Sequence, residues 1–179
     1  MSPRAFRVCL WLLNVVGGVA VLGSYAHGIA SHADPGIALW GHLPASMRPM
    51  YQLSMLAAAA GYFAFGSFLC FRVPPESTRI AGRFGYGAWL VPHALILVPS
   101  TLWMPLTFWY VDAPDNARWI AVRMVLMLVA TGSVLLVMGI ATMQPKTPRG
   151  GWLAALVGAA MFAFHTLVLD ALVWPALYR

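Results

Sequence analysis

Five stretches of the sequence are each apolar over about the length of a bilayer crossing, and this pattern is the strongest constraint on the fold. A helix needs about 20 apolar residues to cross the hydrocarbon core, and its backbone must satisfy its own hydrogen bonds there. The sequence therefore predicts an all-α membrane protein with a single domain, a bundle of five transmembrane helices. The expected spans cover residues 6–30, 50–71, 86–111, 119–142 and 152–178.

The composition limits the partners of such a chain. Hydrophobic residues make up 61% of it and charged residues only 9%, which excludes an ordinary water-soluble domain. The net charge of +6 lies in short loops without an aromatic-interleaved patch, so it indicates contact with anionic lipid and not with nucleic acid. The expected partners are the lipid bilayer, a hydrophobic small molecule and, through Gly/Ala-rich helix faces, a second copy of the chain.

Basic residues divide unequally between the two membrane sides. Because cytoplasmic loops carry more Lys and Arg, the chain is predicted to lie in a bacterial inner membrane, with its N-terminus cytoplasmic and its C-terminus outside. A cleaved signal peptide is the alternative interpretation of the first span, although its apolar run is longer than usual. The cytoplasmic set is Arg4, Arg7, Arg72, Arg79, Arg83, Lys146 and Arg149, against Arg48, Arg118 and Arg179 outside.

The third span combines a membrane-length apolar run with three prolines, Pro92, Pro99 and Pro105. Each proline removes a backbone donor and pushes against the preceding turn, so we expect a bent or broken helix. Such a helix packs poorly as a close-fitting rod, and Trp103 and Phe108 would then wall a concavity beside it.

Ionisable groups inside the spans are the candidates for chemistry, because they are costly there unless paired or hydrated. At ~1.5 Å per residue, Arg123 and Asp170 lie at a similar depth in the outer half, so they are predicted to pair. The pair either ties two helices together or lines a ligand cavity. His27 and Gln52 are expected at the same level.

Two histidines are open to further interpretations. His27 and His165 differ by ~8–9 Å in depth, so a haem held by both is one alternative. Asp170 lies five residues after His165, so intramembrane catalysis by these two side chains is another. Motifs typical of soluble enzymes and metal sites are missing, so no catalytic or metal-binding residue is assigned.

These positions converge on one expected site, a pocket in the outer half of the bundle. Trp103, Tyr51, Phe108 and Phe162 would wall it, His165 would form its floor, and the loop 31–49 would cover it. Aromatic walls favour a flat ligand. The full set of expected ligand-binding residues is Trp103, Tyr51, Gln52, Phe108, Phe162, His27, His165, Arg123 and Asp170.

The segment LVPSTLWMPLTFWY resembles the third-helix region of the TspO/MBR family, the translocator proteins also called peripheral benzodiazepine receptors. The matching residues include Trp103 and Pro105, and the run FAFHTLVLDALVW in the fifth span also suits the family. Ser100 and Ile96 depart from the family's usual asparagine and glutamine. The resemblance implies a five-helix bundle that binds porphyrins or sterols in an outer-leaflet cavity, with Trp103, Phe162 and Asp170 as carried-over site residues.

Three functions follow from the sequence. The first is a membrane receptor or carrier for a flat hydrophobic ligand, either porphyrin-like or sterol-like. No cofactor is assigned, and porphyrin or haem is a candidate ligand. The second is an intramembrane enzyme or haem-binding redox protein that uses His27, His165 and Asp170. The third is a structural membrane subunit.

Overall fold

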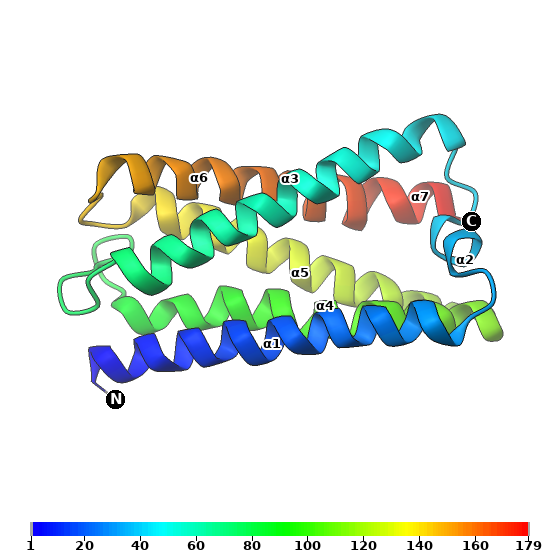
Figure 1. The fold of residues 1–179 in the computed structure, drawn as a ribbon, viewed down its shortest axis with the longest axis horizontal. Coiled ribbons are helices and arrows are strands. Elements are labelled where there is room, and N and C mark those ends of the chain that lie inside the picture. The colour runs from blue at the N-terminus through cyan, green and yellow to red at the C-terminus, as the bar shows by residue number, and fades with distance from the viewer. Residues whose placement is uncertain (1, 179) are drawn as a thin grey trace.

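The computed structural model describes residues 2–178, and within them it is an all-α bundle (Figure 1). Five helical segments are long and apolar enough to cross a membrane, which confirms the predicted fold class. β-Structure in the described residues is confined to two isolated bridges. The two described chain ends lie at opposite ends of the bundle, called here the N-terminal end and the C-terminal end.

The five spans are built from ten helical elements, and α2 (Pro35–Trp40) is a short helix between the first two spans. The first span is α1 (Pro3–Ser31), and the fourth is α5 (Asn116–Thr142). The second joins η1 (Ala45–Met47), α3 (Arg48–Ser67) and the π-helical η2 (Phe68–Arg72), and the third joins η3 (Tyr86–Trp89) to α4 (Leu90–Asp112). The fifth joins α6 (Arg149–Ala163), the π-helix η4 (Phe164–Val173) and α7 (Trp174–Tyr178).

Capping residues fix where two of the long helices begin. The side chain of Ser2 accepts a hydrogen bond from the Ala5 amide, and Asp115 Oδ1 accepts one from the Arg118 amide at 2.9 Å. Such caps satisfy amide groups that the first helical turn leaves unpaired. Both helices therefore begin three residues before the expected apolar runs, at residues 3 and 116.

The helices pack in the cyclic order α1, α4, α5, α6, α3. In the described residues α1 and α3 do not pack along each other, and a hydrogen bond from Tyr62 Oη to Asn14 Oδ1, 2.6 Å long, joins them. Figure 1 shows the two helices separating towards the C-terminal end, where α2 lies. The ring of helices is thus loosest between α1 and α3.

Glycines bring α3 and α6 into backbone contact. A Cβ atom added at Gly61 would lie 2.3 Å from the carbonyl oxygen of Gly158, and one added at Gly158 would lie 2.8 Å from that of Gly61. Small residues are the usual means of close helix packing in lipid. This part of the Gly/Ala-rich face is therefore used within the chain and is not free for a homodimer.

The proline-rich third span differs from its prediction. α4 is one continuous helix, with Pro99 and Pro105 in its interior and Pro92 in its first turn. A Cβ added at Gly132 of α5 would lie 2.9 Å from the Pro92 carbonyl oxygen, and one added at Gly28 of α1 would meet Met104 and Phe108. Neighbouring helices thus pack closely against α4 at these two levels, and the expected break in the helix is not present.

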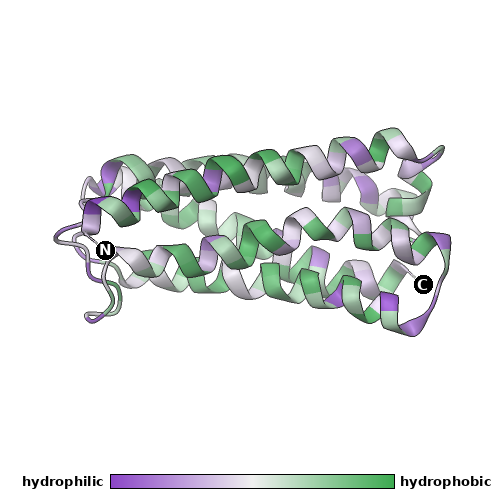
Figure 2. Ribbon diagram, turned by 90° about the horizontal axis from the view of Figure 1, so that it is seen from below, coloured by the Kyte–Doolittle hydropathy of each residue, from purple (hydrophilic) through white to green (hydrophobic). Residues whose placement is uncertain are grey.

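Two buried clusters form the interior, and apolar side chains also cover the outside. The first cluster, around Leu10, Phe65 and Trp89, lies towards the N-terminal end, and the second includes Tyr51 and Trp174. Figure 2 shows hydrophobic residues along the helices and polar residues gathered at both ends. Many large apolar side chains are exposed on the helix surfaces, as expected where lipid is the solvent.

The Gly61 contact can be tested by one added methyl group. Gly61→Ala should lower the free energy of unfolding by about 1–3 kcal/mol, because the new Cβ forces α3 away from α6. Gly18→Ala is the matched control, since nothing lies within 4 Å of its added Cβ and Ala favours the helix. Unfolding of the purified protein in detergent, followed by circular dichroism, measures both. Equal stability of the two variants would contradict the close contact.

Candidate functional site

An ionisable pair lies inside the fifth span. His165 Nε2 is 3.4 Å from Asp170 Oδ2, and both side chains belong to the π-helix η4. Residues five apart on an α-helix point about 140° away from each other. In a π-helix the backbone bonds join residues five apart, so such side chains lie much closer to the same face of the helix. The local π geometry therefore creates the pair.

Hydrogen bonds connect this pair to neighbouring helices. His165 Nδ1 is 3.0 Å from Ser54 Oγ of α3, so both ring nitrogens of the histidine have polar partners. The Thr166 hydroxyl is 2.8 Å from the Ser133 hydroxyl of α5. Hydroxyl groups thus hold η4 in register with α3 and α5.

Aromatic side chains lie close to the His165–Asp170 pair. The Tyr51 hydroxyl donates to the Leu169 carbonyl at 3.0 Å, and both Tyr51 and Tyr25 lie within electrostatic reach of Asp170. The ring of Trp103 packs edge-on against Tyr25, with 5.6 Å between the ring centroids. Its buried Nε1 has no hydrogen-bond partner in the described residues. We call Tyr25, Tyr51, Ser54, His165 and Asp170 the polar site.

The polar site is open on one side. Asp170 lies about 12 Å from the end of its span, counting ~1.5 Å per residue, yet 32% of its side chain is exposed. Its neighbours Tyr25 and Tyr51 come from α1 and α3, the two helices that do not pack along each other. Part of the Asp170 side chain is therefore exposed well inside its span, beside the loosest contact in the ring of helices.

The segment between the first two spans covers the C-terminal end of the bundle, as expected for the loop 31–49. Trp174 Nε1 donates to the Leu39 carbonyl at 3.0 Å, and the Tyr178 hydroxyl donates to the Ala38 carbonyl. The ring of Trp40 meets that of Tyr51 edge-on, with 6.0 Å between the centroids. This contact links the cover to the polar site.

The structure brings some expected site residues together and separates others. Trp103, Tyr51, His165 and Asp170 gather around the polar site, as described above. Phe108 is buried beside it but stacks on His32, with 3.5 Å between ring centroids. Phe162 packs instead against Tyr62 and Phe65 in the cluster towards the N-terminal end, so it and Trp103 do not wall one pocket.

Three other expected site residues, Gln52, His27 and Arg123, are exposed on the outer faces of their helices. One residue step turns a helix by about 100°, so correct depth does not ensure that a side chain points inwards. Each of the three follows or precedes a buried residue in the chain. These buried neighbours are Tyr51, Gly28 and Val122.

Two predicted pairings are therefore wrong. Arg123 lines an outward groove with Met124 and Met127, and no ion pair joins it to Asp170 within residues 2–178. His27 faces outwards with its Nδ1 3.4 Å from the Ser31 hydroxyl, so it does not form a haem site with His165. Asp170 takes His165 as its partner instead.

Sequence reasoning missed Tyr25 and Ser54. Ser54 follows Tyr51 by three residues, and Tyr25 precedes Gly28, which the structure buries, by three. Residues three apart share a helix face. The sequence alone therefore indicates Ser54, one turn from the expected Tyr51, whereas Tyr25 is recognised only once Gly28 is known to be buried.

In residues 2–178 no group of three or more His, Cys, Asp or Glu side chains is placed to hold a metal ion. No protein-family model matches this chain, and no curated protein or solved structure matches it either. The TspO/MBR resemblance therefore stays a prediction, and function has to be inferred from the polar site.

A double-mutant cycle distinguishes the two partners considered for Asp170. His165→Phe and Asp170→Asn should show a coupling energy of at least about 0.5 kcal/mol in unfolding, because the side chains are in contact. Arg123→Leu and Asp170→Asn should be additive within about 0.5 kcal/mol, because Arg123 points away. Coupling in the Arg123 cycle alone would mean that the assigned pair is incorrect.

Proposed function

We propose that this protein is a membrane receptor or carrier that binds a flat hydrophobic molecule, porphyrin-like or sterol-like, at the polar site. The observation that carries the proposal is the ionisable side chain of Asp170, which lies inside a membrane span, is partly exposed and contacts His165 through its carboxyl group. Ionisable side chains inside a membrane are rare and typically mark ligand or ion pathways. The ligand would enter from the lipid between α1 and α3.

The chemistry of the site suits such a ligand. The Asp170 carboxyl oxygens can accept a hydrogen bond from a pyrrole N–H or a sterol hydroxyl. The rings of Tyr25, Tyr51 and Trp103 offer apolar and stacking contacts to a flat skeleton. The indole N–H of Trp103 is an unused donor at the same level.

An acidic group on the ligand would need a cation, and Arg48 is the candidate. Its guanidinium lies 5.8 Å from the Trp40 ring centroid, in the segment that covers the polar site. Its buried Nε has no hydrogen-bond partner in the described residues. Arg48 is therefore the side chain that would meet a porphyrin carboxylate.

Binding is better supported than catalysis. Ser54, His165 and Asp170 follow the order of a nucleophile, a base and a carboxylate, which favours the enzyme alternative. Acyl transfer also needs donors aimed at a developing oxyanion. The amides beside Ser54 lie in the interior of α3, where they bond to the preceding turn, so the backbone there supplies no such donors.

Porphyrin binding tests the proposal. Trp103→Ala should weaken binding by about tenfold or more, because it removes stacking worth about 0.5–1.5 kcal/mol together with buried apolar area. Trp11→Ala is the control, since Trp11 is exposed on α1. Titration of the purified variants, followed by porphyrin fluorescence, measures the dissociation constants. Equal losses would indicate nonspecific uptake, and no loss in either would mean that Trp103 does not contribute to the site.

We also propose the orientation expected from the basic residues, with the N-terminal end in the cytoplasm of a bacterium. Ser77→Cys and Ser46→Cys probe opposite ends, because both serines are exposed. A membrane-impermeant maleimide applied to intact cells should label Ser46→Cys and not Ser77→Cys, with the unaltered protein as background. The reverse pattern would overturn the orientation. A homodimer through Gly/Ala-rich helix faces, for which exposed alanines such as Ala59 and Ala60 are available, stays a prediction.

A further inference from the structure

A groove of about 390 Å³ runs between the second and fifth spans at the N-terminal end. One wall comes from α3 and η2, and the other comes from α6. Its base is largely apolar, and Arg72 lies at its rim. The lining includes Ala64, Ser67, Phe71 and Arg72 on one side and Gly151 and Ala154 on the other.

The crossing of α3 and α6 accounts for the groove. The helices touch at Gly61 and Gly158, and Figure 1 shows α3 running obliquely past α6. Beyond the contact the buried Phe68 ring packs against Gly151, and the groove lies beside this contact, next to the small residue Ala154. From Ala64 to Arg72 the groove extends about 12 Å at ~1.5 Å per residue, close to the hydrocarbon depth of one leaflet.

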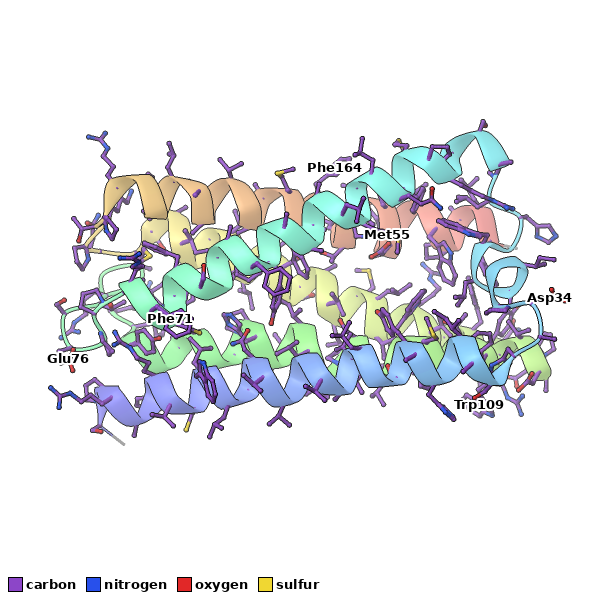
Figure 3. All side chains as sticks on the ribbon, in the orientation of Figure 1. Asp34, Met55, Phe71, Glu76, Trp109 and Phe164 are labelled. Atoms are coloured by element: carbon purple, nitrogen blue, oxygen red, sulfur yellow. The ribbon has the colours of Figure 1, made fainter. Side chains whose placement is uncertain are left out.

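The charge of this end is strongly positive. The segments at the N-terminal end of the bundle contain seven basic residues and a single acidic residue, Glu76. Glu76 forms an ion pair with Arg4, with 3.5 Å between their charged groups. Figure 3 shows Phe71 towards the same end as Glu76, opposite Asp34 and Trp109. Arg72, at the rim of the groove, forms no hydrogen bond or ion pair in the described residues. Arg149, the first residue of α6, also forms no hydrogen bond or ion pair through its side chain in the described residues, and it lies two residues before Gly151.

We propose that this groove binds an anionic phospholipid from the leaflet at the N-terminal end. One acyl chain lies along the apolar lining, and the phosphate group meets Arg72, which lines the groove, and Arg149 at the start of α6. Basic pockets between transmembrane helices recognise anionic head groups through this combination of charge and apolar surface. The proposal is independent of the ligand at the polar site.

The proposed lipid site can be tested by native mass spectrometry of the purified protein. The two lipids compared are phosphatidylglycerol and phosphatidylcholine with identical acyl chains. Phosphatidylglycerol should bind more tightly than phosphatidylcholine. Arg72→Gln should weaken phosphatidylglycerol binding about fivefold, which corresponds to about 1 kcal/mol for one basic side chain near the membrane surface. Arg79→Gln is the matched control, because Arg79 lies at the same end but its side chain donates to the Thr78 carbonyl.

A second variant fills the groove without changing its charge. Ala154→Leu should also lower phosphatidylglycerol binding, while circular dichroism and the unfolding temperature in phosphatidylcholine stay unchanged because Ala154 is exposed. Equal losses for Arg72→Gln and Arg79→Gln would overturn the proposal in favour of general attraction to a basic surface. Binding of glycerol phosphate as tight as that of the lipid would overturn it in favour of an anion site without an acyl-chain groove.

Discussion

The backbone contact between Gly61 and Gly158 determines the position of both sites described above. In lipid, apolar helices gain little from hiding their side chains from each other, so close packing must hold them together. Ser54 and His165 lie seven residues from these glycines towards the C-terminal end, which is about two helical turns along the same faces. The hydrogen bond between them depends on the crossing, because it fixes how far apart the two helices are at that level.

The crossing of α3 and α6 also sets the spacing of the two helices towards the N-terminal end. Phe68 and Gly151 also lie seven residues from Gly61 and Gly158, and they form part of the groove at the N-terminal end. A single contact thus spaces the helices for a hydrogen bond in one direction and for an apolar groove in the other. The two regions differ because polar side chains meet between the helices in one, whereas in the other the Phe68 ring packs against Gly151 and an apolar groove remains beside it.

The number of spans and the depth of most polar side chains could be predicted from the sequence, whereas the direction of those side chains could not. Asp170 and His165 were expected inside the bundle and lie there. Arg123 was expected at a suitable level but points outwards. In a soluble helix the apolar stripe marks the buried face, but here apolar residues cover every face because lipid surrounds them. The sequence pattern therefore contains little information about rotation around the helix axis.

The order in which the helices pack has a consequence for biosynthesis. α1 packs against α4, and α3 packs against α6, so each of the first two spans lies beside a helix made much later. The last three spans pack in sequence, α4 with α5 and α5 with α6. In the membrane, α1 and α3 must therefore persist as separate helices until later spans have been inserted, which their length and hydrophobicity permit. A chain halted after α5 would leave α3 without its principal neighbour, with Gly61 exposed to lipid.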